Sequence, residues 1–286
     1  MDASNTFTLL PMGQTMPLKA GETATGSITV INQQNSAEPF SFRVSVAPYG
    51  VKGDGYDADL VTETEMTQLA KWVTIENPTG TLEPGKSTEV NFTINVPKDA
   101  PGGGQYAAIV VSSDNQSSDP AMVEYVYEMA SIIFGEVAGK TVHEGSIVSH
   151  SVPGFSTTPK VAIDAVLENK GNIHEHARID LTVSEFFSGE DIFSTEESEV
   201  PTTELIMPYS TRNLVRNLTN LPSLGVVTVK ETIKYLGETS TIEKQIYICP
   251  LWFLLLAAFT IIAIIGTIIS RVRHHRRHKR HEIETA

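Results

Sequence analysis

The sequence predicts an all-β protein: two tandem Ig-like antiparallel β-sandwiches followed by one C-terminal transmembrane α-helix. Three observations predict this fold class. Apolar and polar residues alternate in short segments, turn residues separate those segments, and an unbroken apolar run lies near the C-terminus. Alternation is clearest at residues 88–96, where Val90, Phe92, Ile94 and Val96 share one face of a strand. Short alternating strands of this kind are typical of antiparallel sandwiches.

Further strands are predicted wherever β-branched and aromatic residues recur between turn residues. In chain order these strands are residues 27–31, 40–46, 104–112, 123–133, 161–167, 179–183, 225–234 and 242–248. Gly, Pro and Asn mark the turns, as in residues 83–86, 101–104 and 169–172. One short helix is predicted at residues 62–70, within a long loop.

The two halves of the strand-rich region resemble each other, which suggests a tandem duplication. Residues 82–87 are similar to residues 206–210, and residues 30–32 are similar to residues 167–169, in the same order. Each half is therefore expected to be one seven-stranded sandwich. The predicted division is a first sandwich at 1–134, a second at 135–246, a transmembrane helix at 247–270 and a basic tail at 271–286.

The apolar run at residues 251–269 contains no charge and is long enough to cross the hydrocarbon core as a helix. Leu251, Trp252 and Phe253 begin this predicted membrane anchor, and Ile269 ends it. Lys and Arg resist translocation, so the sequence predicts a single-pass plasma-membrane protein with extracellular sandwiches and a cytoplasmic C-terminus. The predicted stop-transfer residues are Arg271, Arg273, Arg276, Arg277, Lys279 and Arg280.

The first residues, Met1-Asp2-Ala3-Ser4, lack the basic and apolar regions of an export signal. We therefore expect a processed form, an engineered start or a misassigned start. The alternative is a tail-anchored protein facing the cytoplasm, which would require the basic tail to cross the membrane.

Composition limits the partners of the exterior part. Without the tail's six basic and two acidic residues, the chain keeps 15 of its 21 Lys and Arg and 32 of its 34 Asp and Glu, a net charge of −17. Such a surface repels nucleic acid and favours a neutral, cationic or protein ligand. Cys249, the single cysteine, lies at the predicted membrane boundary, so packing rather than disulfides must stabilise the sandwiches.

Four short segments resemble the WxL-interacting cell-surface proteins of Gram-positive bacteria. They are residues 71–73, 82–85, 92–97 and 101–106, which include Lys-Trp-Val, Leu-Glu-Pro-Gly and Pro-Gly-Gly-Gly-Gln-Tyr. Members of that family carry a signal peptide, a peptidoglycan-binding-type domain, a second Ig-like domain for a host or protein partner, one transmembrane helix and a basic tail. The resemblance implies that the first sandwich contacts the cell wall and the second a protein.

From the residues alone, the same segments have a structural interpretation. Trp72 is expected to fill space between the sheets. Tyr106 is expected to be a corner tyrosine whose hydroxyl satisfies a backbone group at the start of a strand. Residues 102–104 are interpreted as turn glycines, because no helix follows them to form a phosphate-binding loop.

One acidic loop is a candidate binding site. Asp54, Asp57 and Asp59 are candidate calcium ligands, because hard oxygen donors suit that ion, although the EF-hand spacing is missing. Asp54, Tyr56 and Asp57 are candidate contacts for a polar ligand, because loops on a rigid scaffold often carry recognition. A solvated loop without a ligand is the remaining alternative.

A second cluster contains two imidazoles. His174 and His176 are expected on one face of a strand with Glu175 opposite, which would be part of a zinc site. A third ligand is not evident, since His143 and His150 lie far upstream. An exposed strand edge is the preferred interpretation.

The sequence contains no nucleophile elbow, His-Glu-x-x-His, P-loop or dinucleotide motif. We therefore expect that the protein is not an enzyme and binds no cofactor. The predicted function is a non-enzymatic, membrane-anchored bacterial surface protein that contacts the lipid bilayer and either peptidoglycan or another surface protein, but not nucleic acid. The alternatives are an adhesin or surface-assembly partner without wall binding, and a passive Ig-like stalk.

Overall fold

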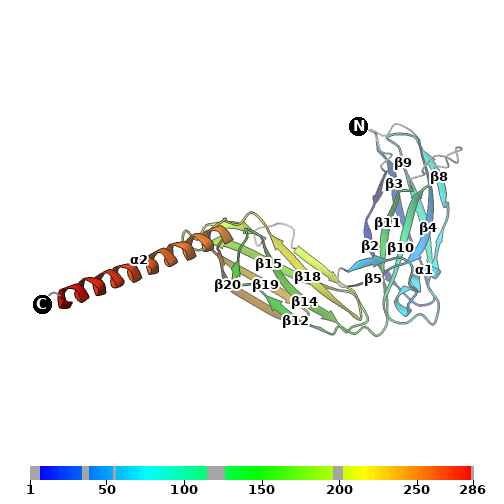
Figure 1. Cartoon of the computed structure of the whole chain (residues 1–286). Helices are drawn as coiled ribbons and strands as arrows, with labels where there is room; N and C mark the ends of the chain where they lie inside the picture. Colours follow the sequence, from blue (N-terminus) through cyan, green and yellow to red (C-terminus); the bar gives the residue numbers. More distant parts are fainter. Residues whose placement is uncertain (1–6, 34–38, 54–55, 115–125, 196–201, 285–286) are drawn as a thin grey trace.

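The computed structural model contains two β-sandwiches that meet at an angle and a long helix that leaves the second sandwich at the end away from the first (Figure 1). It describes residues 7–33, 39–53, 56–114, 126–195 and 202–284, with side chains up to residue 272. The predicted fold class, two tandem sandwiches and one C-terminal apolar helix, is confirmed.

The first sandwich packs a four-stranded sheet against a five-stranded sheet. The smaller sheet has the order β1 (Phe7–Leu10), β3 (Thr23–Asn32), β9 (Ser87–Asn95), β7 (Val73–Ile75). The larger has the order β2 (Gly13–Leu18), β11 (Glu128–Val137), β10 (Gly103–Ser113), β4 (Phe40–Pro48), β8 (Thr79–Leu82). Its pairs are antiparallel except β2 with β11, which is parallel.

The predicted alternation fills the space between these sheets. On β9, Val90, Phe92 and Ile94 are buried while Glu89 and Asn91 are exposed. Trp72 is partly buried and packs against the same core, as expected from the sequence. One continuous cluster of apolar side chains therefore stabilises the first sandwich.

Several small elements connect β4 to β7. They are the hairpin of β5 (Gly50–Lys52) and β6 (Asp57–Asp59), then η1 (Glu65–Thr67) and α1 (Leu69–Trp72). Thr64 begins the helical part, because its hydroxyl accepts the Met66 N–H at 3.2 Å while the Thr67 hydroxyl accepts the Thr64 N–H at 2.7 Å. Where the sequence predicted one short helix at residues 62–70, the structure has two shorter helical elements between residues 65 and 72.

The second sandwich has a three-stranded sheet and a six-stranded sheet. The smaller has the order β12 (Gly145–Ser151), β14 (Val161–Asn169), β18 (Ser210–Leu218). The larger has the order β13 (Phe155–Ser156), β20 (Glu238–Ile248), β19 (Gly225–Tyr235), β15 (Glu175–Glu185), β16 (Asp191–Ser194), and β17 (Thr202–Ile206) also pairs with β15. As in the first sandwich, one pair is parallel, here β13 with β20.

The similarity of the two halves in sequence corresponds to the same hydrogen bond in both sandwiches. Asn32 at the end of β3 donates from Nδ2 to the carbonyl of Leu82 at 2.9 Å. Asn169 at the end of β14 donates from Nδ2 to the carbonyl of Ile206 at 3.1 Å. The same asparagine hydrogen bond therefore joins the similar segments in each sandwich, residues 30–32 to 82–87 in the first and residues 167–169 to 206–210 in the second.

The first sandwich extends beyond residue 134. β11 continues to Val137, because its last residues pair on one side with Gly103 of β10 and on the other with Leu18 of β2. The next strand begins at Gly145. We place the connection between the sandwiches at residues 138–144.

A buried ionic group divides the core of the second sandwich. Glu231 is fully buried, with His150 Nε2 at 2.7 Å from one carboxylate oxygen and Arg216 Nε at 2.6 Å from the other. Its neighbours on β19 belong to two separate apolar clusters, one containing Val229 and the other Ile233. A buried carboxylate is tolerated there because both oxygens are paired.

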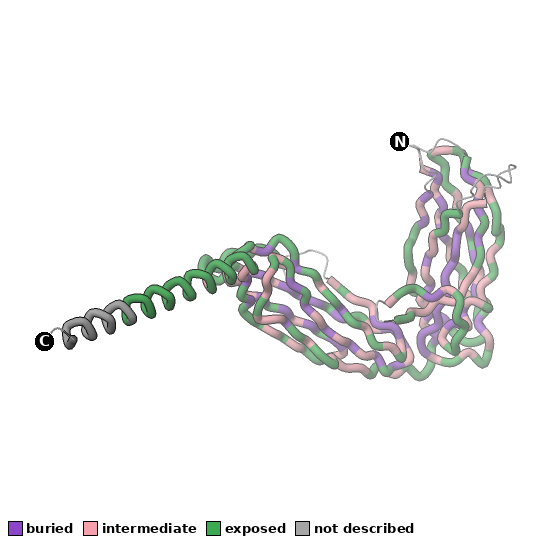
Figure 2. The backbone as a smooth tube through the Cα atoms, in the orientation of Figure 1, coloured by how far each residue is buried: buried purple, intermediate pink, exposed green. Residues whose placement is uncertain are grey.

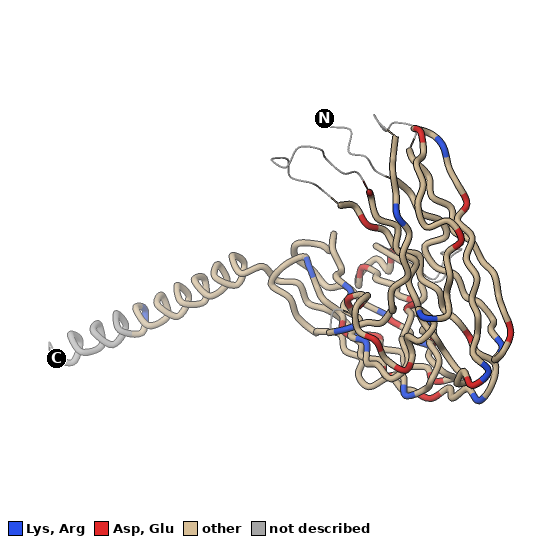
Figure 3. The backbone as a smooth tube through the Cα atoms, turned by 90° about the vertical axis from the view of Figure 1, so that its right-hand side faces the viewer, with Lys and Arg blue, Asp and Glu red and all other residues tan. Residues whose placement is uncertain are grey.

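In helix α2 (Leu251–Glu284), none of the described side chains belongs to the apolar cores of the sandwiches. Its apolar part, Leu251–Val272, is 22 residues long and none of it is buried (Figure 2). Arg271 is the one charged residue in this part, whereas charges of both signs are spread over the sandwiches (Figure 3). A helix so exposed and apolar is a candidate membrane span. The side chains of the predicted stop-transfer residues from Arg273 onward lie outside the described residues.

Candidate functional site

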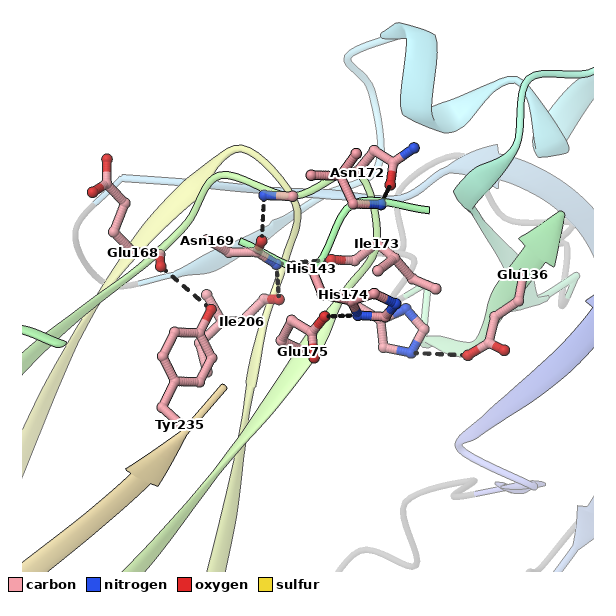
Figure 4. A network of polar contacts seen from close by, with 12 residues as sticks. Glu136, His143, Glu168, Asn169, Asn172, Ile173, His174, Glu175, Ile206 and Tyr235 are labelled. Atoms are coloured by element: carbon pink, nitrogen blue, oxygen red, sulfur yellow. Dashed lines mark hydrogen bonds and ion pairs between the residues drawn. The ribbon is translucent and has the colours of Figure 1, made fainter. Parts of the chain in front are cut away.

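The two sandwiches are joined by a polar junction that several sequence-predicted residues help to form. The first sandwich contributes the start of β10, the β5–β6 hairpin and η1. The second contributes the loop at 169–174 and the turn at 207–210. Figure 4 shows how the residues of this loop and of β11 approach one another.

Tyr106 and His174 form the centre of the junction. The Tyr106 hydroxyl accepts the main-chain N–H of His174 at 2.9 Å and lies 3.2 Å from its Nδ1, to which it can donate. The corner-tyrosine interpretation is therefore right about a backbone group at the start of a strand. That strand, however, is β15 of the other sandwich.

Burial sets the charge state of this pair. Desolvation and, to a smaller extent, the neighbouring His176 together lower the pKa of His174 to about 4. Desolvation also raises the pKa of Tyr106, whereas its hydrogen bond from His174 acts in the opposite direction. Both side chains are therefore neutral at pH 7. The carboxylate of Glu136 on β11 lies 3.8 Å from His174 Nε2 (Figure 4).

The glycines at 102–104 allow the sandwiches to approach closely. A Cβ on Gly103 would lie 2.7 Å from Asn172 of the second sandwich, and its φ of +121° disfavours other residues. A Cβ on Gly102 would lie 2.8 Å from Gly139. Asn172 in turn donates from Nδ2 to the carbonyl of Gly102 at 2.9 Å. The interpretation of these residues as turn glycines is thus incomplete, because the second sandwich requires a glycine at 103 and the connection between the sandwiches requires one at 102.

Tyr56 extends from the β5–β6 hairpin into the second sandwich. Its hydroxyl lies 2.8 Å from Ser210 Oγ and accepts the main-chain N–H of Met207, while the Arg212 guanidinium lies 4.7 Å from its ring centre. Its φ of 60° is unusual for a tyrosine. The loop residue expected to contact a ligand therefore contacts the other sandwich in this structure.

The carboxylates of the acidic loop do not converge in the described part of the chain. Asp54 lies outside the described residues and Asp57 is exposed. Asp59 uses both oxygens within its own turn, accepting from the Val61 and Thr62 N–H groups and the Thr62 hydroxyl, and these bonds lower its pKa to about 2. Among the described residues no three His, Cys, Asp or Glu side chains gather around a metal position, so the calcium site stays a prediction.

The histidine cluster differs from the preferred interpretation. His174 is only 8% exposed and belongs to the junction, whereas His176 is exposed on β15. An exposed strand edge is therefore wrong for His174, because the first sandwich covers it. His143, one of the two upstream histidines, does approach this segment, with its Nδ1 at 2.6 Å from a carboxylate oxygen of Glu175. His150, the other, lies on β12 beside Glu231.

Next to the junction lies a pocket of about 400 Å³ between the sandwiches. Glu65 is the one charged side chain among the described residues that line it. A pair of carboxylates for hydrolysis is thus not found in this lining, and the surface suits recognition of an uncharged or basic group. The larger side chains in the lining are Tyr49, Met66, Tyr106, Met207, Pro208 and Tyr209.

Tyr209 is the most informative residue of the pocket. It is 66% exposed and its φ is 52°, in the left-handed region that a tyrosine occupies at a cost of about 1–2 kcal/mol. In the similar segment of the first sandwich the corresponding residue is Gly85, with φ of 76°. The similarity of residues 82–87 to residues 206–210 could have revealed this strained position, because it aligns Tyr209 with the turn glycine Gly85.

A second hollow, of about 540 Å³, lies in the second sandwich between β16 and β18. Apolar residues such as Leu181, Ile192 and Phe193 line it together with Arg216. Arg216 is paired with Glu231, so its charge is already compensated. This hollow is separate from the junction.

Comparison with known proteins gives no family assignment. No family model matches the chain, and no curated protein matches it. Solved structures with similar folds include a class 5 fimbriae chaperone, CfaA, with 12% identity, a TM-score of 0.38 and coverage of 86% of this chain and 100% of that chain. The SafB chaperone complexed with Salmonella enterica SafA pilin has 13% identity and a TM-score of 0.39, with coverage of 87% of this chain and 99% of that chain. The YadV chaperone has 10% identity and a TM-score of 0.40, with coverage of 84% of this chain and 98% of that chain.

Proposed function

We propose that this chain is a membrane-anchored, non-enzymatic binding protein that presents the pocket between its two sandwiches to a protein partner at the cell surface. The single observation that carries the binding role is Tyr209, an exposed aromatic residue at the pocket whose backbone has a positive φ. The equivalent turn of the first sandwich has a glycine, Gly85, at this position. Residues held in unfavourable backbone conformations cluster at active sites, ligand clamps and switch regions.

The anchor rests on α2. Its 22-residue apolar part is exposed along its whole length, which would be unfavourable for a helix surrounded by water. At about 1.5 Å per residue it reaches roughly 33 Å, enough for a hydrocarbon core of about 30 Å. The basic residues that follow favour a cytoplasmic C-terminus, so the sandwiches would face outward.

The pocket favours a protein ligand of defined chemistry. Its lining combines tyrosine, methionine and proline side chains with the single carboxylate of Glu65. Aromatic and methionine side chains are enriched at protein interfaces, and the net charge of −17 on the exterior part disfavours an acidic partner. We therefore propose a partner segment that inserts an apolar side chain and carries neutral or basic neighbours.

Wall binding by the first sandwich remains a second proposal, implied by the resemblance to WxL-interacting proteins. The matched residues Trp72, Gly103 and Tyr106 face the core or the junction. They support the architecture of the sandwich rather than a sugar-binding surface. Wall recognition would therefore need other residues.

Photo-crosslinking in native membranes tests the binding role. A photoreactive amino acid at position 209 of the full chain is expected to form one dominant protein adduct, and the matched position Val126, 59% exposed at the far end of the first sandwich, is expected to form none. With the partner identified and purified, Tyr209→Gly should weaken binding at least tenfold, or about 1.4 kcal/mol, without lowering stability, because glycine removes the backbone strain.

Equal adducts at positions 209 and 126, or undiminished binding by Tyr209→Gly, would reject the pocket as the binding site. Purified cell wall supplies the competing outcome. Retention of the full chain on wall, unchanged by Tyr209→Gly and without a protein adduct, would favour the second proposal.

A further inference from the structure

The end of the second sandwich next to α2 carries a group of exposed apolar side chains. Glu185 of β15 pairs with Val227 of β19, and Gly225 pairs with Ile248 of β20, so the turn after β15 lies level with the end of β20. Phe186 confirms this position, because its N–H donates to the carbonyl of Val226 at 3.1 Å. The exposed residues at this end, named here the apolar rim, are Phe155, Phe186, Phe187, Leu224 and Tyr247.

The apolar rim comes from four separate segments of the chain. Phe155 lies on β13 and pairs with Tyr247 of β20, while Phe186 and Phe187 begin the turn after β15, and Leu224 directly precedes β19. Phe187 is 81% exposed, the most exposed phenylalanine among the described residues. Aromatic side chains gathered in this way on a surface mark an interaction site.

The connection to α2 fixes how far this end can lie from the hydrocarbon. Only Cys249 and Pro250 separate β20 from α2, so Ile248 and Leu251 are at most about 10 Å apart along the chain. The headgroup region on each side of a bilayer is roughly 5–8 Å thick. A bilayer that holds α2 therefore brings the apolar rim to the level of the headgroups.

Aromatic residues are the side chains that prefer this layer. Trp252 and Phe253 continue the aromatic group into the first turn of α2. The carboxylates of Glu185, Glu190 and Asp191 surround the same turn, which favours a zwitterionic surface over an anionic one.

On the basis of the proposed anchor, we infer that the apolar rim is a membrane-docking surface, which inserts into the headgroup layer of a zwitterionic bilayer and holds the second sandwich against the membrane. The sandwich then stands on the bilayer through two contacts, α2 and the rim. This restricts the rotation that a single helix with a flexible linker would allow, and it gives the junction pocket a fixed direction.

Spin labels on the full chain in phosphatidylcholine nanodiscs test this inference. In a Cys249→Ser background, Phe187→Cys places a label on the rim, and Val148→Cys places the control on β12 of the same sandwich, where Val148 is 57% exposed. Ile261→Cys reports on the middle of the apolar part of α2. The collision rates with oxygen, which enters lipid, and with a water-soluble nickel complex are measured at each label.

The expected result is a several-fold lower nickel accessibility at position 187 than at position 148, with oxygen favoured at 187 as it is at 261. Equal nickel accessibility at 187 and 148, while 261 is shielded, would overturn the docking surface and leave the anchor intact. High nickel accessibility at 261 would instead overturn the anchor itself. Phe186→Ser should raise the nickel accessibility of the 187 label, and no change would also count against the rim.

Discussion

Replacing Tyr106 with phenylalanine removes one oxygen from the centre of the junction. Tyr106 is fully buried, and its hydroxyl accepts the His174 N–H at 2.9 Å and faces His174 Nδ1 at 3.2 Å. The ring of phenylalanine fills the same space, so the packing with Phe134 is kept. What changes is that a buried N–H and a buried ring nitrogen lose their partner.

The expected cost is about 1–3 kcal/mol for one buried group left unsatisfied. Since about 1.4 kcal/mol corresponds to a factor of ten, the His174 amide should exchange its hydrogen roughly 5- to 150-fold faster if exchange follows opening of the junction. Hydrogen exchange of the full chain in nanodiscs, read at a peptide that contains residues 173–179, measures this directly. A local readout is required because a chain with two sandwiches does not unfold in one step.

Tyr235→Phe is the matched control. The Tyr235 hydroxyl is also buried and donates to the Glu168 carbonyl at 3.3 Å, but both residues belong to the second sandwich (Figure 4). Its loss should change exchange near residue 168 and leave the His174 amide protected. Unchanged protection of His174 in Tyr106→Phe would refute the view that this hydroxyl joins the sandwiches.

Three further predictions concern the junction and the second core. The pKa of His174 is lowered to about 4 from an ordinary value near 6.5. Its contribution to the stability of the junction is therefore complete above about pH 6.5 and is lost as the pH falls through 4. The distribution of distances between spin labels at positions 126 and 148 should broaden on acidification, and His174→Gln should remove this pH dependence. Asn169→Ala deletes three hydrogen bonds of a fully buried side chain and should destabilise the second sandwich by about 2–4 kcal/mol, read from hydrogen exchange of its core strands; a loss below about 1 kcal/mol would contradict this. Glu231→Ala removes the buried carboxylate that pairs with His150 and with the partly buried Arg216, and it should cost about 3–5 kcal/mol by the same measurement. A neutral effect would show that the ionic group is not needed for stability.

The sandwich strands could be predicted because their signal is local. Phe92 and Ile94 alternate with polar residues on β9, and this pattern depends only on which face of the strand is buried. The short edge strands β7 and β13 have only three and two residues, which is too few for a pattern to be read. Their pairing is decided by neighbours that are distant in sequence.

The junction could not be predicted, because it depends on contacts between residues far apart in the chain. The sequence singled out Tyr56, Tyr106 and His174 individually, each for a different reason. The structure brings Tyr56 to Ser210 and Tyr106 to His174, across separations of 154 and 68 residues. Periodicity within one strand contains no information about a partner in another sandwich, and the angle between the sandwiches follows from these contacts.

Thiol labelling of intact cells tests the central claim, that α2 holds the two sandwiches on the outer side of a membrane. Val126→Cys in a Cys249→Ala background places one thiol on the exposed far end of the first sandwich. A membrane-impermeant maleimide is predicted to modify this thiol fully before lysis. Modification that begins only after lysis would contradict the proposed topology.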